Sequence, residues 1–472
     1  MTIIRNASWL FACRIAGDVL SLLLFVLISR KFGPAGVGVY SYAFAVTGFV
    51  FVIGGLGIEE YGLREYARMD PARRSRAMAE LFGAQLVMIA AAVVGVGLYL
   101  SLTAPSAATL SVMASLGYYQ AALALSATLF IPAMGQQHML GCAFIDLLCR
   151  GAAFICTGIA INAWDVPLPQ AMLAYPVAGS LLVFLSRRSA VRYSGPFRII
   201  ISRDALLRIV AALWSFAAVE VLAQIVARAG VIVLSLEVGA AAAGLYATGL
   251  RLIEVGLMPL AYMGVAAYPK MSRLFMEDRS KFQSFGLDFI WAVVAAGVIL
   301  AWGLYFLAPP LLVPVLGAKY AGTEPVVRLM AALALIEALE LGMGRVLFAA
   351  NLQVLRAVAI SLGAVSALVL NMVFTRTLGA DGAIAAGVLS FVIINAVYFA
   401  GLRRPLGGAR LLQAVLLPLV ALVLAVSVAW GCRLHGMADG VQAAASVVAF
   451  MLAAGAAFWY VHGQRLFPER GG

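Results

Sequence analysis

Three arginines fall inside long apolar stretches of the sequence: Arg14, Arg228 and Arg251. A charged side chain near the centre of a bilayer costs roughly 2.5–3.5 kcal/mol on insertion scales, so such residues face water, a charge partner or a ligand. A guanidinium presents a planar fork of donors that matches phosphate oxygens, often bidentately. These positions therefore predict a water-filled cavity that binds an anionic group, and a pyrophosphate in particular.

Acidic residues accompany these arginines along the chain. Asp18, Glu220 and Glu254 each lie three to eight residues from one of them, so that both charges fall on one helix face. Each carboxylate has two interpretations that the sequence leaves open. It is either the charge partner of its arginine or a group that couples movement of the bound anion to movement of an ion.

Three further arginines within apolar stretches have a simpler interpretation. Arg150 follows Asp146 by four residues, Arg345 follows two glutamates, and Arg328 lies near the end of its stretch. Pairs separated by three or four residues meet on a helix surface. For these three we expect structural pairing, or a place at the membrane interface, rather than contact with a ligand.

The composition defines the surroundings in which these charges must lie. Hydrophobic residues make up 64% of the 472 residues and charged residues only 11%, whereas soluble domains carry roughly 25% charged residues. The formal net charge of +12 comes from short basic clusters between apolar runs, which is typical of membrane topology signals and not of nucleic-acid binding. We therefore expect an all-α polytopic membrane protein that binds no nucleic acid.

Apolar runs long enough to span a bilayer follow one another along the whole chain. A span needs about 20 mostly apolar residues, and by this rule we expect about fourteen transmembrane helices. Their predicted ranges are 7–29, 37–58, 80–102, 108–131, 139–163, 168–186, 209–236, 242–268, 285–308, 326–350, 355–377, 382–402, 411–433 and 441–461. Glycine and proline mark the joins, as at Gly33-Pro34 and Gly407-Gly408.

Basic residues are distributed unequally between the two sides of the membrane. Most lie on one side, in the segments 64–76, 187–208, 270–281 and 403–410 and near both termini. The opposite side carries only Arg30, Lys31, Lys319, Arg376 and Arg433. The positive-inside rule then places both termini in the cytoplasm.

A short sequence pattern occurs twice. Ser29, Gly33, Gly38 and Tyr40 recur 206 residues later as Ser235, Gly239, Gly244 and Tyr246. Each copy joins the first two helices of a candidate half, so the pattern predicts two six-helix halves of parallel topology, with a substrate site between them. The predicted division is residues 1–186 for the first half, 187–208 for a basic linker, 209–402 for the second half, and 403–472 for two added helices and a short tail.

Motifs for several kinds of enzyme are missing from the sequence. It contains no phosphate loop, no HExxH or GxSxG motif and no zinc-deaminase pattern. The five cysteines form no CxxC pair, and they lie in or at the edge of apolar segments, so we expect no metal site and no cofactor. The loops on the side opposite the termini are too short for a catalytic domain. We expect no catalytic residues.

The chain resembles the polysaccharide biosynthesis or oligosaccharide flippase family. The resemblance rests on the segments 6–11 (NASWLF), 28–40 (ISRKFGPAGVGVY) and 55–57 (GLG), on the pair Arg64-Glu65, and on the second-half segments 244–246 (GLY) and 268–269 (YP). This family belongs to the larger group that also contains multidrug and toxin extrusion transporters and peptidoglycan lipid flippases.

The resemblance implies a flippase of the bacterial inner membrane. Such a protein carries an undecaprenyl-pyrophosphate-linked oligosaccharide repeat unit to the periplasmic leaflet by alternating between V-shaped inward-open and outward-open states. The implied partners are the lipid-linked oligosaccharide and the bilayer, with a polysaccharide polymerase and a chain-length regulator. Arg14 and Arg251 best match the family's arginines in a cationic lumen by position, and Arg228 is a looser match.

Two other functions stay open at this point. A drug exporter of the same fold would take cationic substrates, which favours a cavity dominated by acidic residues and not by arginines. A membrane-bound glycan polymerase would need a large outer loop and a catalytic cluster. The sequence therefore favours the flippase, with the exporter as the alternative and the polymerase as the less favoured one.

Overall fold

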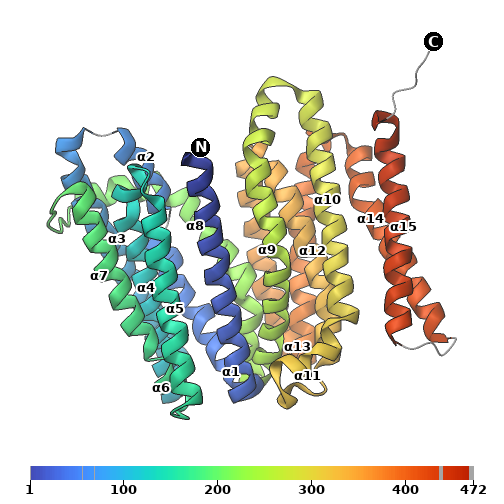
Figure 1. The fold of residues 1–472 in the computed structure, drawn as a ribbon, viewed down its shortest axis with the longest axis horizontal. Helices are drawn as coiled ribbons and strands as arrows, with labels where there is room; N and C mark the ends of the chain where they lie inside the picture. Colours follow the sequence, from blue (N-terminus) through green and yellow to red (C-terminus); the bar gives the residue numbers. More distant parts are fainter. Residues whose placement is uncertain (1, 56, 69, 435–438, 467–472) are drawn as a thin grey trace. The chain divides into compact units, whose positions relative to one another are not determined.

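The computed structural model describes residues 2–55, 57–68, 70–434 and 439–466, and this part of the chain is helical without any strand (Figure 1). Membrane-spanning backbone must satisfy its hydrogen bonds internally, and helices built from long apolar runs do so. In chain order the elements are α1 (Thr2–Gly55), α2 (Ile58–Arg68), α3 (Pro71–Thr103), α4 (Ala107–Gly135), α5 (Met139–Asn162), α6 (Leu168–Ala171), α7 (Ala174–Ser194), α8 (Arg203–Glu237), α9 (Ala240–Glu277), α10 (Arg279–Phe306), α11 (Ala308–Leu316), the 3₁₀ turn η1 (Ala318–Tyr320), α12 (Glu324–Ala349), α13 (Gln353–Leu406), α14 (Gly408–Leu434) and α15 (Asp439–Leu466).

The predicted spans are confirmed as helices. In the described part of the chain, ten helices are long and apolar enough to cross a membrane. Two of them, α1 and α13, are 54 residues long and contain two predicted spans each. The predicted span 326–350 is α12, which carries several charged residues, and the span 441–461 lies within α15. The protein is a polytopic membrane protein. The predicted tail beyond residue 466 lies outside the described residues.

Glycines with positive φ interrupt the two longest helices. Gly33 in α1 has φ 68° and Gly379 in α13 has φ 59°, a region that favours glycine because it has no β-carbon. The residue after Gly33 is Pro34, which cannot donate a backbone hydrogen bond to the preceding turn. The break at Gly33 agrees with the join predicted there from the sequence.

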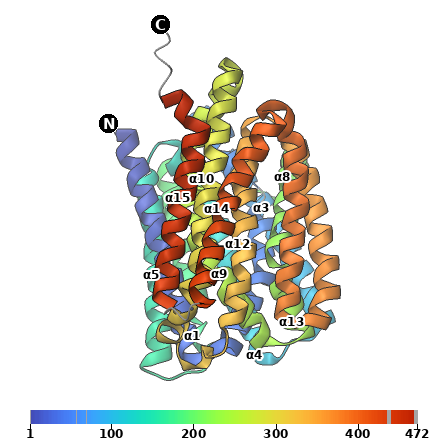
Figure 2. The same ribbon diagram turned by 90° about the vertical axis from the view of Figure 1, so that its right-hand side faces the viewer.

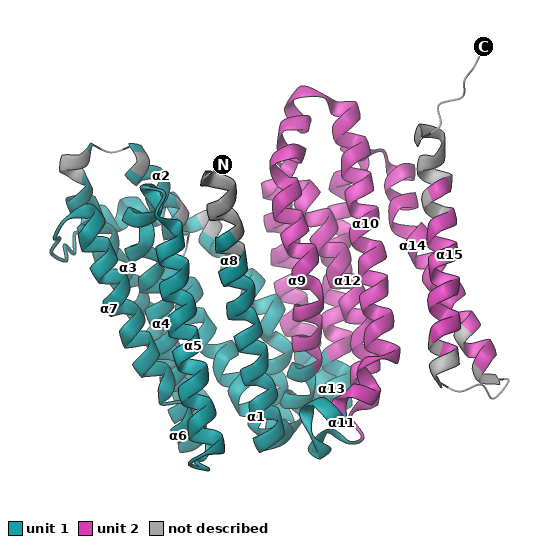
Figure 3. Ribbon diagram, viewed as in Figure 1, with its two compact units in different colours: residues 1–248, 313–321, 371–383 teal, residues 249–312, 322–370, 384–472 magenta. Residues whose placement is uncertain are grey.

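The described helices group into two compact units (Figure 3). Unit 1 comprises residues 1–248, 313–321 and 371–383, and unit 2 comprises residues 249–312, 322–370 and 384–472. The units are defined by contacts in space, so unit 1 includes α8 and the first turns of α9. The two six-helix halves, which were defined by the sequence repeat, stay a prediction.

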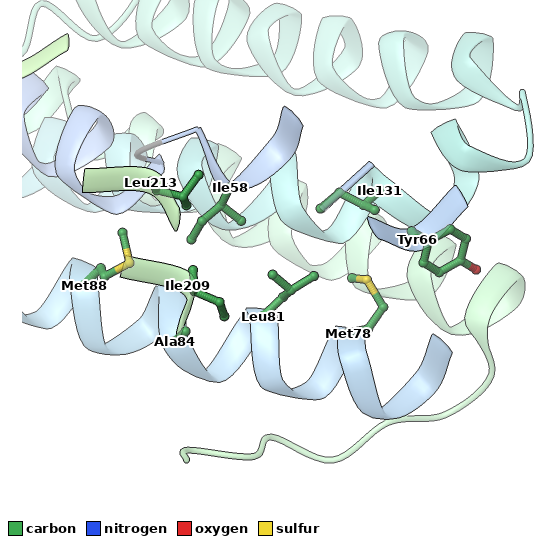
Figure 4. Packing of buried hydrophobic residues seen from close by; sticks show 9 residues of the cluster. All are labelled: Ile58, Tyr66, Met78, Leu81, Ala84, Met88, Ile131, Ile209 and Leu213. Carbon is green, nitrogen blue, oxygen red and sulfur yellow. The ribbon is translucent and has the colours of Figure 1, made fainter. Parts of the chain in front are cut away.

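In unit 1, α1 packs against α3, α4, α5 and α8, and α4 packs closely along α7. A separate core lies at one end of the unit, where α2, α3, α4 and α8 meet (Figure 4). The short helix α2 was not predicted, and it contributes Ile58 and Tyr66 to this core. It forms because its apolar residues fall on one face while its charged residues face outward.

In unit 2, α10 packs against α12 and α14, and α14 and α15 lie side by side (Figures 1 and 2). Small residues allow the close approach of α10 and α12, since Gly297 faces Ala338 and Gly342 faces Val293. The Trp302 indole N–H donates a hydrogen bond to the Ser446 hydroxyl at 2.8 Å and so connects α10 to α15.

Helices extend from both sides into the predicted basic linker, residues 187–208. Helix α7 continues through Arg187, Arg188 and Arg192, and α8 begins at Arg203, so only residues 195–202 are non-helical. Ser202 caps α8 by accepting a hydrogen bond from the Ala205 backbone N–H. Arginine is a good helix former, which favours the continuation of α7 through this basic segment, and the division of the chain at residues 187–208 stays a prediction.

The two copies of the sequence repeat contact each other reciprocally within unit 1. A β-carbon added to Gly38 would lie 1.7 Å from the carbonyl oxygen of Ala240. One added to Gly244 would lie 1.8 Å from the carbonyl oxygen of Pro34. Positions 34 and 38 of the first copy correspond to positions 240 and 244 of the second copy. Each glycine therefore approaches the carbonyl group of the residue that corresponds to the other contact's acceptor, so the two contacts are symmetric. Gly33 and Gly239 also both have positive φ, so the repeat extends to the backbone conformation.

Candidate functional site

The predicted charges of α1 lie one helical turn apart. Arg14 is exposed, and Asp18 is partly buried. Asp18 also lies close enough to Arg150 of α5 to act on its guanidinium. The two helices approach closely at Gly17, where an added β-carbon would lie 3.0 Å from Cδ of Arg150. Glycine at position 17 therefore lets the Arg150 side chain cross α1 next to Asp18.

The predicted pairing of Asp146 with Arg150 is confirmed. Nε of Arg150 donates a hydrogen bond to Oδ2 of Asp146 at 2.8 Å, and each side chain is about one third exposed. The pair joins successive turns of α5, as the spacing of four residues predicts. Together with Asp18, it brings three charged side chains to the α1–α5 contact within unit 1.

Aromatic side chains extend this charged cluster across unit 1. Tyr119 of α4 lies next to Arg150, and its ring packs edge-on against Tyr175 of α7 with centroids 5.0 Å apart. Tyr175 is hydrogen-bonded to Tyr40 of α1, and Tyr40 stacks on Phe44 one turn later. The spacing of these residues does not indicate the row, because its members come from three helices that are distant along the chain.

The row of aromatic residues ends at Arg228 of α8. The Arg228 guanidinium carbon lies 5.8 Å from the centroid of the Phe44 ring, within the range of a cation–π contact. Arg228 is partly buried, whereas Glu220, two turns earlier on α8, is exposed. The structure thus brings Arg228 to α1 and connects it, through aromatic rings, to the cluster around Arg150.

Arg251 and Glu254 lie on α9 in unit 2. Nη1 of Arg251 and Oε2 of Glu254 are 3.2 Å apart, so the predicted pair is present. Both side chains are partly exposed, at 21% for Arg251 and 35% for Glu254. That Arg14, Arg228 and Arg251 share one cavity stays a prediction.

Three other charged residues within the helices of unit 2 contact neighbouring residues: Arg328, Glu340 and Arg345. Arg328 lies 5.7 Å from the Tyr305 ring centroid, and Glu340 accepts a hydrogen bond from the Tyr398 hydroxyl at 3.2 Å. The Arg345 side chain lies across Gly264 of α9. Among the described residues no direct ion pair joins Arg345 to Glu340, and the Glu340 carboxylate instead accepts the hydrogen bond from Tyr398 of α13.

The sequence pattern that defines the polysaccharide biosynthesis proteins matches residues 3–275, more than half of the chain. The chain belongs to this family. The predicted resemblance is therefore confirmed, and the matched region contains Arg14, Arg228 and Arg251. A comparison with curated proteins found no match.

Solved structures share the fold of this family member at low sequence identity. A structure described as lipid II flippase MurJ in an inward closed conformation has a TM-score of 0.75 at 13% identity, covering 95% of this chain and 98% of that one. An inward-facing MATE family multidrug transporter of the MOP superfamily has a TM-score of 0.64 at 13% identity, covering 82% and 94%. A mutant of the Vibrio cholerae MATE transporter VcmN has a TM-score of 0.53 at 15% identity, covering 85% and 98%.

Proposed function

We propose that the protein is a flippase that moves an undecaprenyl-pyrophosphate-linked oligosaccharide repeat unit across the bacterial inner membrane for polysaccharide synthesis. The observation that carries the proposal is the presence of arginines within the apolar helices of a member of the polysaccharide biosynthesis family. The fold shared with a lipid II flippase is consistent with it. Both termini would lie in the cytoplasm, where the basic clusters favour them.

The chemistry of the substrate explains why the protein needs these arginines. A pyrophosphate with its sugars cannot cross hydrocarbon unaided, whereas a polyprenyl tail can stay in the lipid. Guanidinium groups bind pyrophosphate oxygens through charge-assisted hydrogen bonds. Arg14, Arg228 and Arg251 would provide these bonds in a cavity between the two predicted halves, and alternating access of the halves would expose the headgroup to one side and then the other.

Substitution of the arginines tests the proposal. Arg14→Ala, Arg228→Ala and Arg251→Ala should each reduce export of lipid-linked repeat units about 10–100-fold, because each removes a charge-assisted hydrogen bond worth about 1.5–3 kcal/mol. Export is measured as repeat units that reach the periplasmic side, and protein amounts are measured in the same membranes. Arg273→Ala is the matched control, since Arg273 is an exposed arginine of α9 outside the predicted cavity.

The controls also define what would overturn the proposal. Normal export in all three arginine variants would exclude a cationic cavity as the binding site. Export of a cationic drug in place of repeat units, with the arginine variants unaffected, would favour an exporter of the same fold. Loss of export in Arg273→Ala to the same extent would show that the assay reports general damage.

An ion gradient could drive the cycle through Asp18, Glu220 or Glu254. Glu254 contacts Arg251 and Asp18 lies near Arg150, so each of these carboxylates is also explained as a charge partner, and substitution of Asp18 separates the two interpretations for the first span. Transport into vesicles should be measured with and without a proton or sodium gradient, in the wild type and in Asp18→Asn. Loss of the gradient dependence in Asp18→Asn would support coupling at Asp18, and an unchanged dependence would exclude it.

A further inference from the structure

A groove of ≈ 1190 Å³ opens in unit 1 between the N-terminal part of α1, the start of α5 and the end of α7. Figure 1 labels these helices, and α5 and α7 are coloured teal in Figure 3. Pockets for small molecules measure roughly 300–1,000 Å³, so this groove is large enough for a lipid. Its lining includes residues that the proposed transport cavity does not use, and none of the lining residues that the structure describes is acidic.

One end of the groove is positively charged. Arg188 and Arg192 of α7 both line it, are both exposed, and lie four residues apart on the same helix face. His138, just before α5, stacks on the Tyr193 ring with centroids 4.8 Å apart and an interplanar angle of 27°. The Arg192 guanidinium carbon lies 5.8 Å from the centroid of the same ring.

Hydrogen bonds hold this charged end in place. The Gln136 side-chain amide donates to the Tyr193 carbonyl oxygen at 2.7 Å, and the Tyr66 hydroxyl donates to it at 3.3 Å. Three separate segments of unit 1 therefore converge on Tyr193. The cationic groups around Tyr193 are consequently positioned by the fold.

The other end of the groove is apolar. Leu140, Phe144, Ile145 and Leu147 of α5 line it together with Leu185 of α7. Phe144 is 60% exposed and Leu140 is 40% exposed. At 1.5 Å per residue, Phe144 and Leu147 lie roughly 9–14 Å further along α5 than His138. The groove therefore presents cations at the interface and hydrocarbon deeper in the membrane.

We propose that this groove binds an anionic phospholipid, with the phosphate between Arg188, Arg192 and His138 and an acyl chain along Leu140, Phe144 and Leu147. Basic pockets between transmembrane helices bind anionic lipid headgroups in this way. The described lining favours a phospholipid over a lipid-linked glycan, because most of it besides the cations is apolar and suits an acyl chain, with Trp9, Gln137, Ser189 and Tyr193 as the other main hydrogen-bonding side chains. The site is independent of the proposed flippase activity.

Native mass spectrometry with phosphatidylglycerol and phosphatidylcholine tests the site on the full-length protein. The wild type should retain phosphatidylglycerol in preference to phosphatidylcholine. At about 1 kcal/mol for each arginine, the Arg188→Gln/Arg192→Gln double variant should weaken this preference about 30-fold. The Arg198→Gln/Arg203→Gln variant removes the same charge from exposed residues outside the groove and should keep the preference.

A second variant tests the acyl-chain part without changing any charge. Gly141 lines the groove, and an added β-carbon there would meet nothing within 4 Å. Gly141→Phe should therefore fold normally and fill the groove, which should reduce retention of phosphatidylglycerol, whereas Gly141→Ala should leave it unchanged.

Three results would overturn the proposal. Equal losses in the two double-arginine variants would show a general charge effect. Full retention in Gly141→Phe would exclude the groove as the site. Displacement of phosphatidylglycerol by an equal concentration of undecaprenyl pyrophosphate, lost again in Arg188→Gln/Arg192→Gln, would identify the groove as a site for the polyprenyl lipid instead.

Discussion

Replacement of Gly38 by alanine tests the contact between the two repeat copies most directly. The new β-carbon would lie 1.7 Å from the Ala240 carbonyl oxygen, although β-carbons essentially never approach other heavy atoms within 3.0 Å. The obstacle is a backbone atom, so no side-chain rotation can relieve the clash, and the two segments must separate by more than an ångström. Overpacking of this kind typically costs about 1–3 kcal/mol. We expect a loss of about 3 kcal/mol, because the backbone itself has to move.

The equivalent contact gives the experiment an internal check. Gly244→Ala should destabilise the protein by a similar amount, because its β-carbon would meet the Pro34 carbonyl oxygen at 1.8 Å. The double variant should cost less than the sum of the two single variants, because separation of the segments by the first alanine makes room for the second. The measurement is the free energy of unfolding of detergent-solubilised protein, from titration with a denaturing detergent.

Gly97→Ala is the matched control, since an added β-carbon on this glycine of α3 meets nothing within 4 Å. It should leave the stability unchanged or raise it slightly, because alanine favours helix more than glycine does. The reasoning would be refuted if Gly38→Ala and Gly97→Ala had the same free energy of unfolding. It would also be refuted if the effects of Gly38→Ala and Gly244→Ala were fully additive.

Three further predictions concern single contacts. Trp302→Phe removes the hydrogen bond to Ser446 and should lower the free energy of unfolding by about 1 kcal/mol. The Trp302→Phe/Ser446→Ala double variant should be only slightly less stable than Trp302→Phe, because the shared hydrogen bond is already lost. Arg150→Ala leaves Asp146 without its ion-pair partner and should lower the free energy of unfolding by roughly 1–2 kcal/mol. This is the low end for a charged hydrogen bond, because both side chains are partly exposed. The Asp146→Asn/Arg150→Ala double variant should recover part of this loss in the same titration. The pKa of Asp278 is lowered, first by the Lys281 backbone N–H at the start of α10 and then by the Lys281 side chain. Its stabilising effect is therefore present above the ordinary pKa of 3.8 and lost as the pH falls through the lowered value, so thermal melts of the wild type should fall towards those of Asp278→Ala only under acidic conditions.

The helices could be predicted from the sequence because each depends on a local property. Long apolar runs define the spans, and Gly33-Pro34 marks a break that the backbone shows as a positive φ. The pairs Asp146–Arg150 and Arg251–Glu254 were also predictable, because residues three or four apart meet on any helix. Helix α2 was missed because it is too short and too charged to resemble a membrane span.

The contacts between helices could not be predicted in the same way. Tyr40, Tyr119 and Tyr175 meet because α1, α4 and α7 pack together, and nothing in their spacing indicates it. His138 stacks on Tyr193, 55 positions later in the chain, and no local spacing indicates this contact. Arg188 and Arg192 were recognised only as topology signals, since their shared groove depends on where α5 and α1 lie.

The environments of the three candidate arginines differ, so their substitutions by alanine should reduce transport to different extents. Arg251 already has a carboxylate at 3.2 Å, so a phosphate that binds it must compete with Glu254. Arg228 lies over the Phe44 ring and is partly buried. Arg14 is exposed along a helix that spans the membrane, and a charge in that position costs roughly 2.5–3.5 kcal/mol unless water or a ligand solvates it. If these arginines bind the pyrophosphate, Arg14→Ala should therefore reduce transport more than Arg251→Ala, and the opposite order would mean that Glu254 releases Arg251 when the substrate binds.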